Sequence, residues 1–214
     1  MTDPFNLILI LAVAALLPFI AVVTTSFIKL SVVLSLVRNA LGVQQVPPNI
    51  ALNALAMILS AYIMAPVVME TYDLVSTAKP NYGTADGLKL AFETGRGPLE
   101  RFLGKHASGR EKAFFLESAR ELWPKTLSDG LTADNIVIVL PAFTVSQLRE
   151  AFEVGFLLYL PFLAIDLIVT NILLALGMMM VSPLTISLPF KLFLFITVDG
   201  WSRLILGLVK TYSH

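Results

Sequence analysis

Long uncharged runs of apolar residues alternate with one charged segment along this chain. The run at residues 5–28 is long enough for a helix that crosses the roughly 30 Å hydrocarbon core of a bilayer, and the runs at residues 50–69 and 167–190 are likewise uncharged. Residues 70–150, in contrast, hold 21 of the 30 charged residues. The pattern predicts an all-α fold with two long hydrophobic helical hairpins, residues 1–69 and 151–214, separated by a small polar helical insertion at residues 70–150.

The first hairpin contains recognisable start and stop signals. The Asp-Pro pair at residues 3–4 predicts a helix start, because Asp is a favoured cap and Pro fits the first helical position. Pro18 is expected to kink this helix, and the Pro-Pro pair at residues 47–48 forces a connection to the second helix. Lys29 and Arg38 are the basic residues nearest to that connection, so the positive-inside rule predicts that it faces the cytoplasm.

The polar insertion is expected to form amphipathic helices of its own. Pro98 follows a glycine-rich turn signal and can open one helix. A second helix, residues 110–123, should end before Pro124 and bury one apolar face. That face would comprise Phe115, Ala119, Leu122 and Trp123. The short apolar run at residues 136–140 is interpreted as either a strand or a buried link. Balanced charges in this segment indicate a solvated surface.

The helix that leads into the second hairpin is expected to begin near the end of the insertion. Thr144 and Gln147 have the spacing of a capping box and predict the start of the third hydrophobic helix. Residues 199–201, Asp-Gly-Trp, separate a last apolar helix from the one before it. The bend of this hairpin is expected within residues 174–183, which read LALGMMMVSP.

Three consecutive methionines occupy this bend. Met178, Met179 and Met180 follow Gly177 and precede Pro183, so they are expected on a turn whose hinges are that glycine and that proline. Neighbouring residues on a helix point about 100° apart and could not share one face. Methionine is flexible and polarizable, which suits a deformable apolar plug. It is also a common filler of hydrophobic cores, and the triplet by itself is compatible with both interpretations.

Four charged residues lie in or beside the apolar segments: Lys29, Asp166, Lys191 and Asp199. A lone charge in hydrocarbon costs several kcal/mol, so such groups usually pair or line a wet cavity. One hypothesis is a proton relay through Asp166. The other is a set of structural ion pairs, within or between subunits, such as Asp166 with Lys191 or Lys29. We favour the ion pairs, because a relay needs several titratable groups in series.

The composition narrows the function further. The chain is 57% hydrophobic and only 14% charged, which indicates a membrane protein or a part of a large apolar assembly. Its net charge is zero, which argues against a nucleic-acid partner. The sequence has no cysteine and two histidines, and it lacks the motifs of hydrolases, metalloproteases and nucleotide-binding enzymes. We therefore expect no enzymatic activity, no catalytic residues, no cofactor and no metal site.

Several long motifs resemble one family in the correct order. The segment FIKLSVVLSLVRNALGVQQVPPN, residues 27–49, is similar to the SctR/FliP family of type III secretion export-apparatus proteins. So is the segment at residues 155–201, through its LPFLAID, LALGMMMVSP, LPFKL and DGW motifs. The sequence of the first segment is more similar to the virulence injectisome branch, SctR, than to the flagellar branch. The polar insertion carries no recognisable signature.

This resemblance implies a multi-subunit export channel in the bacterial inner membrane. Family members assemble as five copies with SctS-like and SctT-like proteins into a helical cone around the channel, next to SctU-like and SctV-like components. The cone passes unfolded secreted proteins, contacts membrane lipid and faces the periplasm. The resemblance assigns Met178, Met179 and Met180 to a methionine gasket that closes the pore. The alternative function is a conventional multispan transporter that couples ions through Asp166.

Overall fold

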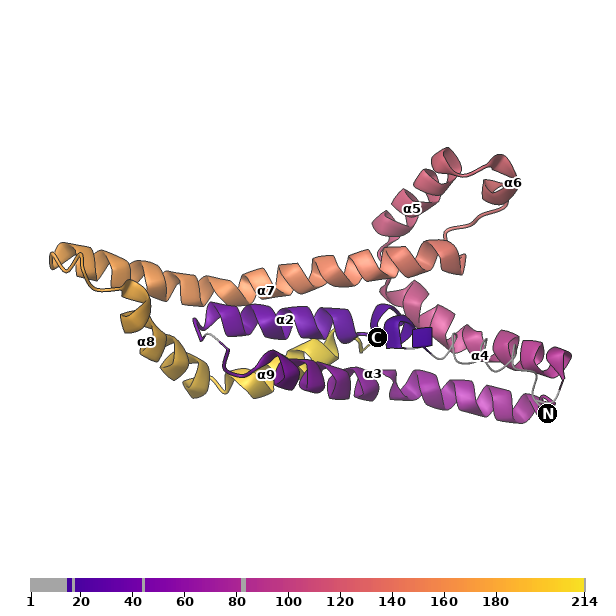
Figure 1. The fold of residues 1–214 in the computed structure, drawn as a ribbon, viewed down its shortest axis with the longest axis horizontal. Helices are drawn as coiled ribbons and strands as arrows, with labels where there is room; N and C mark the ends of the chain where they lie inside the picture. Colours follow the sequence, from indigo (N-terminus) through magenta and orange to yellow (C-terminus); the bar gives the residue numbers. More distant parts are fainter. Residues whose placement is uncertain (1–14, 17, 44, 82–83, 214) are drawn as a thin grey trace. The chain divides into compact units, whose positions relative to one another are not determined.

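The structure is a computed structural model that describes residues 15–16, 18–43, 45–81 and 84–213. These residues form helices, turns and connections without any strand, which confirms the predicted all-α class. The helix start predicted at residues 3–4 lies outside the described residues. A helical segment at residues 18–24 is followed by α2 (Phe27–Ala40), α3 (Asn49–Ala78), α4 (Ala85–His106), α5 (Gly109–Leu122), α6 (Lys125–Ser128), α7 (Ile136–Ala175), α8 (Pro183–Thr197) and α9 (Gly200–Lys210) (Figure 1).

The chain divides into two compact units. One comprises Met1–Ile28 and Met64–Gln147, and the other comprises Lys29–Ile63 and Leu148–His214. All three divisions fall inside helices, because α2, α3 and α7 each contribute to both units. The segment boundaries predicted from charge, after residues 69 and 150, also fall inside α3 and α7. Charge therefore changes along these helices without ending them.

Two helices are long and apolar enough to cross a membrane, α3 and α7. Two bent helix pairs, residues 18–24 with α2 and α8 with α9, would raise the number of spans to as many as four among the described residues. The first pair is interrupted at Thr25 and Ser26, whereas the sequence predicted a kink at Pro18. The Thr24 and Thr25 hydroxyls donate to carbonyls four residues earlier, at 2.8 and 2.7 Å, a bond that bends helices.

In the first unit, α4 is longer than the sequence predicted. Pro98 lies inside this helix and does not open it, so the prediction of a turn there was wrong. The helix starts instead after Thr84, whose hydroxyl accepts a hydrogen bond from the Gly87 amide at 3.1 Å. Thr84 supplies the start signal, and the proline is tolerated at the cost of a backbone hydrogen bond. Phe102 and the fully buried Leu103 form the core face of α4.

The apolar face predicted for α5 is only partly buried. Ala119 is buried, but Leu122 is 79% exposed and Trp123 is 38% exposed. The helix begins after Ser108 and ends at Leu122, close to the predicted bounds. Helical periodicity identifies which residues share a face, but it does not show how far the neighbouring elements extend over that face.

The run at residues 136–140 is the first turn of α7, so the predicted strand or link is wrong. Asn135 starts the helix, since its carbonyl accepts from the amides of Ile138 and Val139 at 2.8 and 2.9 Å. The capping box predicted further along is also wrong, because Thr144 lies inside the helix and donates to the Leu140 carbonyl at 3.0 Å. With 40 residues, α7 is about 60 Å long, roughly twice the thickness of the bilayer core.

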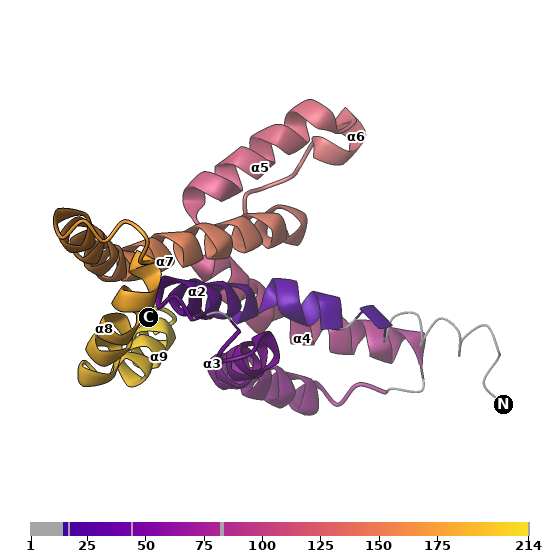
Figure 2. The same ribbon diagram turned by 60° about the vertical axis from the view of Figure 1, so that its left-hand side comes forward.

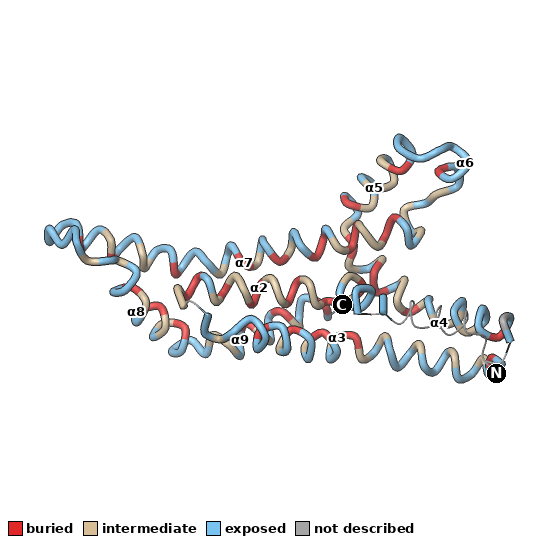
Figure 3. The backbone as a smooth tube through the Cα atoms, in the orientation of Figure 1, coloured by how far each residue is buried: buried red, intermediate tan, exposed pale blue. Residues whose placement is uncertain are grey.

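In the second unit, α2 lies alongside the later part of α7 (Figures 1 and 2). Figure 3 shows that buried positions recur along α2, and they include Leu30, Val33, Leu34 and Val37. Gly155 allows the close approach of the two helices, because a Cβ atom at this position would lie 2.3 Å from Leu36 Cδ1. The tight contact explains a glycine inside a long helix, where it normally costs about 1 kcal/mol relative to alanine.

The α8–α9 pair is bent by 62° between Thr197 and Gly200. Asp199 has a φ of 52°, in the left-handed region. A Cβ atom on Gly200 would come within 2.4 Å of the Phe195 ring, so glycine is needed for the ring to pack here. The Phe195 and Trp201 rings then meet edge to face, with centroids 5.3 Å apart. The Asp-Gly-Trp motif therefore forms the bend that the sequence predicted.

Candidate functional site

The loop that joins α7 to α8 carries the three methionines. Their exposed fractions increase along the loop, from 44% at Met178 to 81% at Met179 and 100% at Met180. Met179 and Met180 therefore contribute little to the packing of the second unit, and Met178 contributes only part of its surface. An exposed apolar cluster of this kind marks a surface for another molecule.

Backbone hydrogen bonds explain why the loop leaves the helix at this point. Gly177 has a φ of 71°, its amide donates to the Leu174 carbonyl at 3.0 Å, and the Met178 amide donates to the Leu173 carbonyl at 2.9 Å. This pair of bonds around a left-handed glycine is the Schellman helix ending. Pro183 occupies the first turn of α8, where its missing N–H costs nothing. Glycine and proline thus fix the two ends of the methionine loop.

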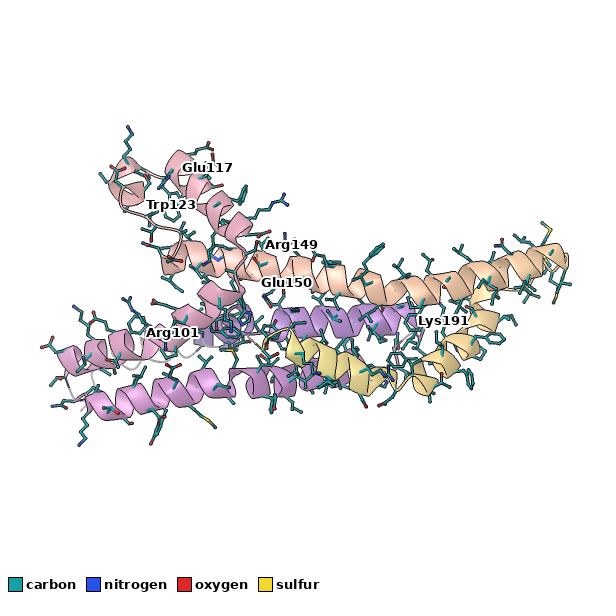
Figure 4. All side chains as sticks on the ribbon, turned by 180° about the vertical axis from the view of Figure 1, so that it is seen from behind. Arg101, Glu117, Trp123, Arg149, Glu150 and Lys191 are labelled. Carbon is teal, nitrogen blue, oxygen red and sulfur yellow. The ribbon has the colours of Figure 1, made fainter. Side chains whose placement is uncertain are left out.

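Asp166 and Lys191 form a salt bridge between α7 and α8. The Lys191 Nζ lies 2.6 Å from Asp166 Oδ2, and the Ser187 hydroxyl donates to Asp166 Oδ1 at 2.6 Å. Lys191, which Figure 4 labels on α8, is only 2% exposed and also donates to the Ala40 carbonyl at 3.2 Å. Both carboxylate oxygens are engaged, and the ammonium has two acceptors. This cluster links α7 and α8 to the end of α2.

A second buried cluster surrounds Lys29. Its ammonium lies 2.7 Å from Glu150 Oε2, donates to the Thr211 hydroxyl at 2.9 Å and lies 4.7 Å from the centre of the Tyr212 ring. Three elements meet here, since Lys29 comes from α2, Glu150 from α7 and the other two from the residues after α9. Burial, and secondarily the Glu150 carboxylate, raises the pKa of the Tyr212 phenol above its ordinary value.

The described residues contain no group of three or more His, Asp or Glu side chains that could hold a metal ion. The buried charges of α7 and α8, Asp166 and Lys191, are paired with each other. The loop thus presents apolar side chains, and the ion pair fixes α7 against α8.

Comparison with known proteins places the chain in a family. A sequence profile described as the FliP family matches residues 10–208. The chain is 53% identical over 211 residues to the Yop proteins translocation protein R of Yersinia pestis, covering 99% of this chain and 97% of that protein. It is 49% identical over 211 residues to the hypersensitivity response secretion protein HrcR of Ralstonia nicotianae, covering 97% of each.

A third relative, the virulence protein YscR of Salmonella typhimurium, is 47% identical over 214 residues, with 99% of this chain and 98% of that protein covered. The chain belongs to the FliP family. The resemblance to the SctR/FliP proteins of type III secretion export apparatuses, seen in the sequence motifs, is thereby confirmed. The match includes the methionine loop, Asp166 with Lys191, and Lys29 with Glu150, whereas Thr211 and Tyr212 lie beyond the matched residues of this FliP-family chain.

The structure of this FliP-family chain distributes the four predicted charged residues differently. Asp166 and Lys191 are brought together, whereas Lys29 pairs with Glu150 and not with Asp166. Asp199 is exposed and accepts a hydrogen bond from the Ser202 hydroxyl at 2.9 Å, so it is not a buried ion-pair partner within the described chain. Its position at the start of α9 keeps it in solvent at the bend.

Sequence reasoning missed Glu150 and Thr211 as partners of Lys29. Glu150 lies 121 residues from Lys29 and was grouped with the polar insertion, although it faces the hydrophobic hairpins. Its position at the last turn before an apolar run was the available signal, because a carboxylate there can reach a buried cation. Thr211 follows a charged helix end and gives no comparable signal.

Proposed function

We propose that this FliP-family chain is an export-gate subunit of a bacterial type III secretion apparatus, which passes unfolded proteins across the inner membrane. In this proposal, five copies assemble with SctS-like and SctT-like proteins into a helical cone, next to SctU-like and SctV-like components. The chain is multi-pass by its apolar helices and faces the periplasm within the assembled system. The family membership and the long apolar helices support this assignment.

The observation that carries the proposal is the exposure of Met178, Met179 and Met180 on one loop. A single copy cannot close a channel, but copies arranged around an axis would bring several flexible thioethers to one level. An apolar ring of this kind can block small ions by dewetting. It can also deform around polypeptides of varied sequence, because methionine requires no single rotamer.

The alternative function, an ion-coupled transporter that uses Asp166, receives less support. A proton relay needs a carboxylate that can exchange its proton with a chain of neighbours. Asp166 is instead held by Lys191 and Ser187, one on each oxygen, and no metal-binding cluster accompanies it in the described residues. This arrangement supports a structural role for Asp166, as the sequence hypothesis favoured.

Ion conductance through the assembled complex tests the gate. Changing Met178, Met179 and Met180 to Ala removes the filling side chains without adding charge, so leakage of ions and small solutes should increase while assembly is preserved. The matching change to Leu nearly conserves volume and should keep the seal. Changing Met57 and Met69, two exposed methionines of α3, to Ala serves as the control and should not alter conductance. An assembled triple Ala variant that stays as tight as the parent would place the gate elsewhere.

A further inference from the structure

An apolar groove runs between α7 and the bent α8–α9 pair in the second unit. It has a volume of about 400 Å³, within the range of ligand sites. Its walls include Leu158, Phe162, Phe195, Val198 and Leu204, and the charged residue that lines it is Arg203. The groove is thus almost purely hydrocarbon with one cation at its edge.

Arg203 is exposed and forms no salt bridge with any described residue. The two buried cations of these hydrophobic helices are engaged, because Lys29 pairs with Glu150 and Lys191 pairs with Asp166. Asp199, one turn before Arg203, accepts the hydroxyl of Ser202. The Arg203 guanidinium therefore remains available to an anion, and its planar donor set suits bidentate contact with phosphate oxygens.

The groove lies near the polar end of the apolar part of α7. Glu153 is the last charged residue before that apolar run, and the groove residues Leu158 and Pro161 follow five and eight positions later. At a rise of 1.5 Å per residue, this places them about 8–12 Å along the helix. The long side chain of Arg203 can reach from this depth to the headgroup region.

We propose that this groove binds an anionic phospholipid, with an acyl chain along its apolar walls and the headgroup phosphate on Arg203. A peptide segment would suit the groove poorly, because its N–H and C=O groups would find no hydrogen-bond partners on these walls. An acyl chain has no polar groups to satisfy. The lone cation at the edge complements a negatively charged headgroup, as basic residues near a membrane surface do.

Native mass spectrometry of the full-length chain, released from bilayers of equal parts phosphatidylglycerol and phosphatidylcholine, tests the site. The parent should retain phosphatidylglycerol in preference. Arg203→Gln should lower that retention about fivefold, the effect of one basic residue near an anionic surface. Lys210→Gln, which removes an exposed basic residue of the same helix outside the groove, should leave retention unchanged. Equal loss in both variants, or no loss with Arg203→Gln, overturns the proposal.

A second measurement, photocrosslinking of the parent chain, tests the site even if Arg203→Gln folds poorly. A phosphatidylglycerol with a photoreactive acyl chain should crosslink the parent chain at the groove walls, and Val198→Trp, which fills the groove from its edge, should abolish that crosslink. Crosslinks spread evenly along α3 and α7 would indicate unspecific annular lipid and overturn the site. Val198→Trp that instead breaks contact between copies, with no lipid crosslinked in the parent, would identify the occupant as a second copy and overturn it as well.

Discussion

The Lys29 ammonium and the Glu150 carboxylate, 121 residues apart in the chain, lie 2.7 Å from each other. Their side chains differ in exposure, since that of Lys29 is 3% exposed and that of Glu150 is 35% exposed. The buried Lys29 ammonium therefore depends on Glu150 for compensation of its charge more than Glu150 depends on Lys29. Without Glu150 the ammonium would be buried with only the Thr211 hydroxyl and the Tyr212 ring, whereas Glu150 without Lys29 could still be solvated.

The first prediction follows from this asymmetry. Glu150→Gln should destabilise the chain by roughly 3–5 kcal/mol, the cost of leaving a buried charge without its partner. Lys29→Met should cost clearly less, because it removes the buried charge and keeps most of the apolar stem. Thermal unfolding of both variants in detergent measures the difference. Glu153→Gln, at a carboxylate with a 63% exposed side chain, is the control and should stay within about 0.5 kcal/mol of the parent. Equal losses of stability in Glu150→Gln and Lys29→Met would contradict this prediction.

The second prediction separates structure from proton transfer at Asp166. Asp166→Asn removes the negative charge beside Lys191, which is 2% exposed and also donates to the Ala40 carbonyl. The unpaired buried charge should lower the stability of the chain by about 3–5 kcal/mol. Assembly of the complex and secretion should therefore decline together. Adding Lys191→Met should restore part of both, because the double variant has no buried charge. Asp199→Asn, at an exposed carboxylate, should have no effect.

Blue native electrophoresis measures assembly of the complex, and a secretion assay on the same variants measures export. If Asp166→Asn assembles normally and only proton-coupled export fails, the relay hypothesis replaces the ion pair. Secretion that recovers in the double variant would speak against a relay, since that variant has no titratable group at either position.

The sequence predicted the apolar helices and their main bends because the relevant signals are local. An uncharged run of sufficient length, a glycine that tolerates positive φ and a proline at a helix start act within a few residues. This is why the methionine loop, with Gly177 and Pro183 at its ends, could be placed in advance. The charged residue Asp166 also stood out, because a carboxylate within an apolar run demands a partner.

Predictions that depended on distant contacts were less successful. The partner of Lys29 could not be found from spacing, because α2 and α7 are brought together by packing at Gly155 and Leu36. Pro98 and Pro141 are strong local breakers, yet both lie inside helices. A helix that is fixed elsewhere can tolerate the loss of one hydrogen bond, and this tolerance is a tertiary property that local rules do not contain.

The third prediction concerns alkaline pH. The Tyr212 phenol has its pKa raised above the usual value of 10.0, chiefly by burial, so the folded chain keeps it neutral while the unfolded chain ionises it. Stability from this group is fully present below pH 10 and decreases as the pH rises above it. Tyr212→Phe should flatten this part of the stability profile, measured by thermal unfolding at increasing pH. Tyr72→Phe, at a 72% exposed ring, should leave the slope unchanged. Identical slopes for parent and Tyr212→Phe would show that other groups cause the alkaline loss.

The last prediction compares two glycines that have open space at the Cβ position but differ in backbone conformation. A Cβ atom added at Gly177 or at Gly207 would meet no other atom within 4 Å, but only Gly177 has a positive φ, of 71°. Gly177→Ala should therefore cost about 1–2 kcal/mol of backbone strain at the end of α7. Gly207→Ala, inside α9, should be neutral or stabilising by up to about 1 kcal/mol.

The strain at Gly177 has a functional consequence if the methionine loop is the gate. An alanine there would relax by unwinding the Schellman ending, which would move Met178 away from the Leu173 carbonyl that now holds its amide. Leakage through the assembled complex should then increase for Gly177→Ala and remain at the parent level for Gly207→Ala. Gly177→Asn should restore the seal, because asparagine tolerates the left-handed conformation better than alanine does. Should all three variants conduct like the parent, the position of this loop would not determine closure of the channel.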